Sequence, residues 1–148
     1  ASAWIAAGVA LKAPAEGKMD KISLLIVDDE IVVQGSCVDI FTEKSNRYDI
    51  TTVSSGDEAE ALLTRKHFDI ILTDLKMPGL PGMELIARIR TKHPDTAIIV
   101  ITGFSTVQTA VEVMKQGAID FIPKPFTPDE IFNVVENAAS KLKSRSSK

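Results

Sequence analysis

The stretch Ile22-Ser-Leu-Leu-Ile-Val-Asp-Asp-Glu30 joins a mainly apolar run to an acidic cluster. A short apolar run of this kind is typical of a parallel β-strand that is covered on both faces. In open α/β sheets, ligands bind at the carboxyl ends of the strands. The acidic cluster therefore stands where the site of such a fold is expected.

The same pattern recurs along the chain. Further strand-like segments cover residues 48–53, 68–73, 96–101 and 118–122, and helical spacing of apolar residues separates them. The last helix begins with a capping box, in which Thr127 is the N-cap and Glu130 its partner. Five strands alternating with five helices predict a doubly wound α/β fold, with a parallel sheet between two layers of helices.

Apolar spacing also predicts which helix faces are buried. In the first helix, Ile31, Val32, Gly35, Val38 and Phe41 share one face, and Cys37 is expected to be buried. In the helix at 106–115, the predicted core stripe is Val107, Ala110, Val111 and Met114, and Gly117 is the expected C-cap.

Two large apolar residues fall off their stripes. Val113 and Phe132 are expected to be exposed on the fourth and fifth helices. They are either isolated surface hydrophobes or part of an output or homodimer surface.

Length and composition limit the classes of function. The 148 residues suit one domain, and the net charge of −3 argues against direct nucleic-acid binding. A single cysteine cannot form an internal disulfide, so a reduced cytoplasmic setting is expected. The apolar run at 3–11 is shorter than the ~20 residues of a membrane span. We expect a tag or linker remnant at 1–18, one folded domain at 19–142, and a basic tail or linker at 143–148.

Polar residues follow four of the predicted strands. Asp28-Asp29-Glu30 follows the first strand, Asp74 the third, Thr102 the fourth and Lys124-Pro125 the fifth. Clustered carboxylates repel one another unless a cation joins them, and Mg²⁺ prefers oxygen ligands. Each residue alone reads as a helix cap or turn former, but together they suit phosphoryl transfer. Asp74 is then the nucleophile, and Lys124 and Thr102 hold phosphoryl oxygens.

Four segments carry a family resemblance. Leu25-Ile-Val-Asp-Asp-Glu30, Thr73-Asp-Leu-Lys-Met-Pro-Gly79, Ile101-Thr102 and Ile122-Pro-Lys-Pro-Phe126 resemble the response-regulator receiver family. The resemblance covers about 20–142, and 102–126 is most similar to receivers of the nitrogen-regulator type, which usually control a sigma-54 activator ATPase. It implies a flavodoxin-like sheet with strand order 2-1-3-4-5.

The resemblance also implies roles at the site. Asp74 is the expected phosphoacceptor. Mg²⁺ is held directly by Asp29, Asp74 and the backbone carbonyl of Lys76, while Asp28 acts largely through water.

Further implied roles concern the phosphoryl group and the switch. Thr102 and Lys124 contact the phosphoryl group, and Phe121 is the switch aromatic that turns inward with Thr102. The Lys124–Pro125 bond is expected to be cis. Lys76 and Phe104 occupy positions associated with the lifetime of the phosphorylated state.

The implied function is a signalling switch. A sensor histidine kinase or phosphotransfer protein would donate the phosphoryl group, and the change would pass to an output domain or partner, with transcription regulation as the expected process. The domain would have only weak self-phosphorylation and autodephosphorylation. One alternative is a haloacid-dehalogenase-type phosphatase, which wants a second Asp where Lys76 stands. Another is a flavodoxin-like binding module, or a receiver that works without phosphate.

Overall fold

The computed structural model describes residues 21–103 and 105–146. Strands and helices alternate throughout these residues, in the following order: β1 (Ile22–Val27), α1 (Ile31–Lys44), β2 (Tyr48–Val53), α2 (Gly56–Leu63), β3 (Ile70–Thr73), α3 (Gly82–Lys92), β4 (Ala97–Thr102), α4 (Val107–Gln116), β5 (Asp120–Pro123) and α5 (Pro128–Ser146). The segment predicted as a remnant at 1–18 lies outside the described residues, as does Phe104.

The five strands form one parallel sheet in the order β2-β1-β3-β4-β5. This confirms the predicted fold class and strand order. In the register, Val27 is the partner of both Val53 and Thr73, and Thr73 in turn is the partner of Val100. The carboxyl ends of β1, β2 and β3 therefore stop level with one another, at a single edge of the sheet.

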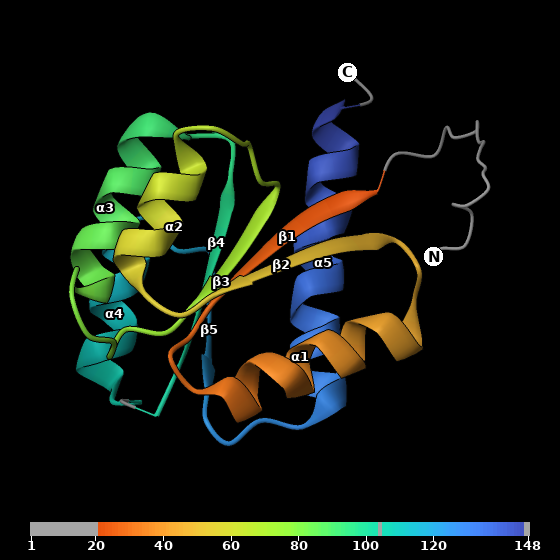
Figure 1. Cartoon of the computed structure of the whole chain (residues 1–148), viewed down its shortest axis with the longest axis horizontal. Helices are drawn as coiled ribbons and strands as arrows, with labels where there is room; N and C mark the ends of the chain where they lie inside the picture. The colour runs from red at the N-terminus through yellow and green to blue at the C-terminus, as the bar shows by residue number, and fades with distance from the viewer. Residues whose placement is uncertain (1–20, 104, 147–148) are drawn as a thin grey trace.

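Helices cover both faces of the sheet (Figure 1): α1 and α5 lie on one side, and α2, α3 and α4 on the other. Side chains alternate across the sheet with the two-residue period of a strand. Leu24 and Ile26 of β1 accordingly pack toward α1 and α5, whereas Leu25 and Val27 pack toward the opposite layer. Burial on both faces explains why the strands are almost wholly apolar.

Two predicted local signals are present in the structure. Thr127 Oγ1 accepts the N–H of Glu130, and Glu130 Oε1 accepts the N–H of Thr127, which completes the capping box. Gly117 ends α4 with a φ of 120°, a conformation that favours glycine.

The predicted core face of α4 is wrong. Val107, Val111 and Met114 are 83%, 48% and 45% exposed, whereas Val113, which was expected at the surface, is 0% exposed. Apolar residues occur on both sides of this helix, and the periodic pattern pointed to the side with more of them. The side that packs is decided instead by contacts of Val113 with the apolar layer under α3.

The first and fifth helices need related corrections. In α1, Ile31 and Val32 are exposed, and the buried positions are Gln34, Cys37 and Phe41. Cys37 is buried as predicted, and burial raises the pKa of its thiol to about 12. Phe132 of α5 is half-buried rather than exposed, because its ring packs 5.7 Å from that of Phe41.

Candidate functional site

Four of the predicted polar residues lie together at the carboxyl edge of the sheet. Backbone hydrogen bonds continue the strand pairing one step beyond the strand ends: Asp28 N–H donates to Val53 O, Asp74 N–H to Val27 O, and Lys124 N–H to Thr102 O. These bonds fix the main chain of each site residue against a neighbouring strand. The sheet therefore converts four distant sequence positions into one site.

Lys124 is the centre of this site. Its Nζ lies 2.8 Å from Asp74 Oδ2, 2.8 Å from Glu30 Oε1 and 2.9 Å from Asp28 Oδ2. The first two contacts are hydrogen bonds, while the contact to Asp28 is an ion pair. The Lys124–Pro125 peptide bond is cis, as predicted.

The charges of the site do not cancel. Asp28, Glu30 and Asp74 surround one ammonium group, so three ionised carboxylates and one cation leave a net charge of −2. Burial raises the pKa of Asp28, and the hydrogen-bonding groups around it offset this only in part. Burial would lower the pKa of Lys124, but the close carboxylates of Asp74, Glu30 and Asp28 raise it instead. The site therefore favours a further cation.

Both oxygens of the Asp74 carboxylate already have donors. Oδ2 accepts from Lys124, and Oδ1 accepts from the backbone N–H of Lys76 at 3.2 Å. Thr102, the last residue of β4, is buried at the same edge of the sheet. Phe121 of β5 is half-buried and packs on the α2–α3–α4 side.

The carboxylates that could hold a metal ion differ in part from the predicted set. Ligand atoms of Asp28, Glu30 and Asp74 lie within 4.8 Å of one another. Asp29 is exposed, and among the described residues it is outside this group, so its role as a direct ligand stays a prediction. The sequence did not single out Glu30 as a ligand. The signal that could have identified it is its position directly after Asp28 and Asp29.

The donor set suits a divalent metal. All three groups offer carboxylate oxygens, the type of ligand that Mg²⁺ prefers, and their net negative charge with Lys124 is not balanced within the site. The buried Oδ2 of Asp28 has no directed hydrogen bond, so an oxygen lone pair remains available. The residues present therefore fit the Mg²⁺ expected from the sequence.

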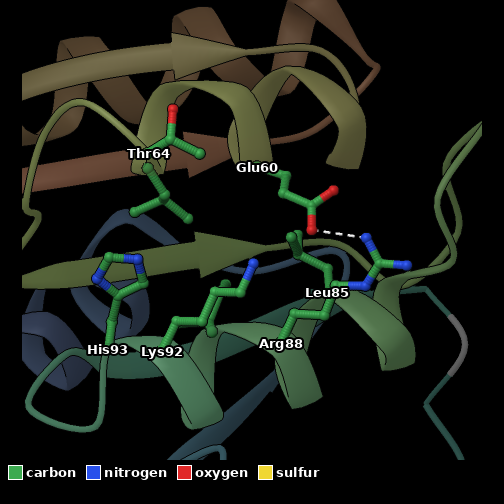
Figure 2. A pocket seen from close by; sticks show the side chains of 8 residues that line it. Glu60, Thr64, Leu85, Arg88, Lys92 and His93 are labelled. Atoms are coloured by element: carbon green, nitrogen blue, oxygen red, sulfur yellow. Dashed lines mark hydrogen bonds and ion pairs between the residues drawn. The ribbon is translucent and has the colours of Figure 1, made fainter.

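A separate cleft of about 260 Å³ lies between α2 and α3 (Figure 2). Leu63, Leu85 and Ile89 line it and are themselves almost fully buried. Arg88 at its rim is neutralised by Glu60 at 2.6 Å and Glu84 at 2.7 Å. None of the site residues predicted from the sequence lines this cleft, so we place the chemistry at the sheet edge.

Among the residues that the structure describes, no helix has both the length and the apolar character to cross a membrane.

The chain is similar to known regulators along most of its length. The family model of the response regulator receiver domain matches residues 24–136. The DNA-binding transcriptional regulator NtrC of Salmonella typhimurium is 41% identical over 90 residues, covering 61% of this chain and 19% of that protein. The nitrogen assimilation regulatory protein NtrX of Azorhizobium caulinodans is 34% identical over 124 residues, covering 82% of this chain and 27% of that protein. The chain thus spans about a fifth to a quarter of the length of these relatives.

Solved structures agree with this assignment. A receiver domain from Methanospirillum hungatei has a TM-score of 0.80 at 23% identity, over 85% of this chain and 99% of that one, which shows the fold. NtrX from Brucella abortus has a TM-score of 0.76 at 27% identity, over 86% of this chain and 28% of that one. With more than half of its residues matched by the family model and the acidic site at the expected edge of the sheet, the chain belongs to the response regulator receiver domain family of two-component systems.

Proposed function

We propose that this domain is a phosphorylation-dependent switch, in which Asp74 accepts a phosphoryl group from a sensor histidine kinase or a phosphotransfer protein. The observation that carries the proposal is the position of the Asp74 carboxylate. Asp74 directly follows the central strand β3, its carboxylate lies 2.8 Å from the Lys124 ammonium, and it shares a small volume with two further carboxylates.

The transfer requires few groups because positioning and charge neutralisation supply most of its rate. A carboxylate oxygen of Asp74 forms a bond to phosphorus while the P–N bond of phosphohistidine breaks, and the imidazole leaves with the bonding electron pair. Lys124 exchanges part of its contact with carboxylates for a phosphoryl oxygen, and Thr102 donates a hydrogen bond to another. The acyl phosphate later hydrolyses, so the domain acts once per phosphoryl group and has only weak self-directed catalysis.

Mg²⁺ is proposed to bind at this edge through Asp28, Asp29 and Asp74 together with the Lys76 carbonyl. When bound, it would supply positive charge to the phosphoryl oxygens. Glu30 competes for Lys124 in the structure, and it is a candidate to shift toward the metal or solvent when Lys124 turns to the phosphoryl group.

We propose that the exposed apolar face of α4 is the surface that binds a partner when Asp74 is phosphorylated. This face, defined here as Val107, Val111 and Met114, replaces the surface predicted from Val113 and Phe132. Its occupant is a second copy of the domain or an output domain, and Thr102 and Phe121 connect it to Asp74. Because NtrC is named a DNA-binding transcriptional regulator, transcription is the proposed process, carried out by regions other than the domain at 19–142.

The test is intact mass after incubation with acetyl phosphate and Mg²⁺. We expect the wild type to gain one phosphoryl group, and we expect Asp74→Asn or a chelator to prevent the gain. Asp39→Asn is the matched control, since Asp39 is an exposed aspartate on α1. A wild type that stays unmodified with both acetyl phosphate and a histidine kinase would refute the proposal, as would an Asp74→Asn variant that is modified equally well.

A further inference from the structure

Gln34 is a buried polar residue with no assigned role. It lies on α1, one turn beyond the acidic loop, and only 9% of its surface is exposed. Its amide nitrogen lies 2.5 Å from Asp28 O, 3.2 Å from Val53 O and 3.1 Å from Ser54 Oγ. Two amide hydrogens thus serve three acceptors: one in the loop after β1, one on the last residue of β2 and one in the loop after β2.

One of these loops is held firmly from the other side. Ser55 Oγ accepts the N–H of Glu58 as the N-cap of α2, and Glu58 Oε1 accepts the N–H of Ser54, the residue before this cap. The loop after β2 is therefore fixed to its own helix. Gln34 connects this fixed loop to the loop after β1.

The loop after β1 contributes Asp28 and Glu30 to the acidic site. The N–H of Asp28 donates to Val53 O and its carbonyl accepts from Gln34, so both sides of this residue's main chain are held. Its side chain is also oriented locally, because Oδ1 accepts the N–H of Glu30. The remaining oxygen, Oδ2, is the one that lies beside Lys124.

Mg²⁺ binding depends on accurately placed ligands, because the ion requires near-octahedral geometry with short metal–oxygen distances. Groups that orient metal ligands through hydrogen bonds typically alter metal affinity 10- to 100-fold when they are removed. We infer that Gln34 is a positioning residue: through the Asp28 carbonyl, its amide sets the placement of the acidic loop and so the affinity of the site for Mg²⁺. This inference rests on the proposed function.

The experiment measures Mg²⁺ binding by calorimetry and by the amide resonances of residues 28–30, with unfolding by urea in parallel. Gln34→Met keeps the length of the side chain but cannot donate a hydrogen bond. We expect its Mg²⁺ affinity to fall about tenfold or more. The matched control is Gln116→Met, at an exposed glutamine on α4, which should bind Mg²⁺ like the wild type.

Two further variants separate positioning from general stability. Ser54→Ala removes one acceptor but leaves the bond to the Asp28 carbonyl, so its Mg²⁺ affinity should stay close to that of the wild type. Gln34→Asn keeps a polar amide that is one methylene too short, so it should weaken Mg²⁺ binding, and it replaces Gln34→Met if that variant does not fold.

The outcomes distinguish this inference from the proposed function. If folded Gln34→Met or Gln34→Asn binds Mg²⁺ as tightly as the wild type, and only the urea midpoint changes, Gln34 has a structural role alone and the inference is overturned. If the wild type itself binds no Mg²⁺, the proposed function fails and the inference falls with it.

Discussion

Lysine substitutions at Val111 and Val113 test the orientation of α4. Val113 is 0% exposed and packs in the apolar layer with Leu85 and Ile89, whereas Val111 is 48% exposed. Replacing Val113 forfeits about 1.5–3 kcal/mol of apolar burial. It also places an unpaired ammonium in the core, which costs several kcal/mol more. We therefore expect Val113→Lys to lower the free energy of unfolding by about 4 kcal/mol or more.

The same change at Val111 should behave differently. An exposed helix position tolerates lysine, so the free energy of unfolding should stay within about 0.5 kcal/mol of the wild type. If the α4 face mediates self-association, Val111→Lys should reduce the association that phosphorylation induces, without loss of the phosphoryl group on Asp74.

Urea unfolding followed by circular dichroism gives the stabilities, and sedimentation velocity gives the association. Should Val113→Lys not express, Val113→Ala serves in its place, with an expected loss of about 1–3 kcal/mol. Equal losses at positions 111 and 113, or a larger loss at 111, would refute the orientation of α4 described here.

Two further predictions concern titratable groups. Burial raises the pKa of Asp28 in the folded state above its value of about 4 in the unfolded chain. The protonated carboxyl therefore favours the folded state at low pH. This contribution to the free energy of unfolding is lost as the pH rises from about 4 through the pKa of the folded state. Asp28→Asn should therefore be more stable than the wild type at pH 7 without divalent cations, by urea unfolding, and equal or lower stability of the variant would contradict this. Burial and the hydrogen bond to Glu136 raise the pKa of Tyr48, so its contribution to stability should be lost above about pH 10. Tyr48→Phe should lower the free energy of unfolding by about 1 kcal/mol at pH 7, and its stability should fall less at alkaline pH than that of the wild type. An unchanged fall in stability at alkaline pH would argue against the Tyr48–Glu136 hydrogen bond.

Much of the fold followed from local patterns. The apolar run at 22–27 and the β-rich segment at 48–53 predicted β1 and β2 with their observed bounds, and the other three strands were placed within two residues at each end. The caps at Thr127 and Gly117 were predictable because a capping box and a C-terminal glycine act within one turn of helix. The convergence of Asp28, Asp74, Thr102 and Lys124 was predictable as well, because parallel strands bring their carboxyl ends to one edge.

Other features depended on contacts between distant segments. The sequence of α4 has apolar residues on both sides, so its period indicates which residues share a face but not which face meets the sheet. Gln34 was not recognised because its acceptors belong to two separate loops, after β1 and β2, and no local pattern connects them.

The sequence by itself therefore determined the order of the elements and the identity of the groups that meet at the sheet edge, since both depend on local periodicity and on parallel pairing. Only the tertiary structure decided that Val113 turns inward and that Lys124 binds Glu30 as well as Asp28 and Asp74. Those outcomes depend on packing and on electrostatic contacts between side chains that are far apart in the chain. Such contacts form only when the sheet and both helix layers have assembled.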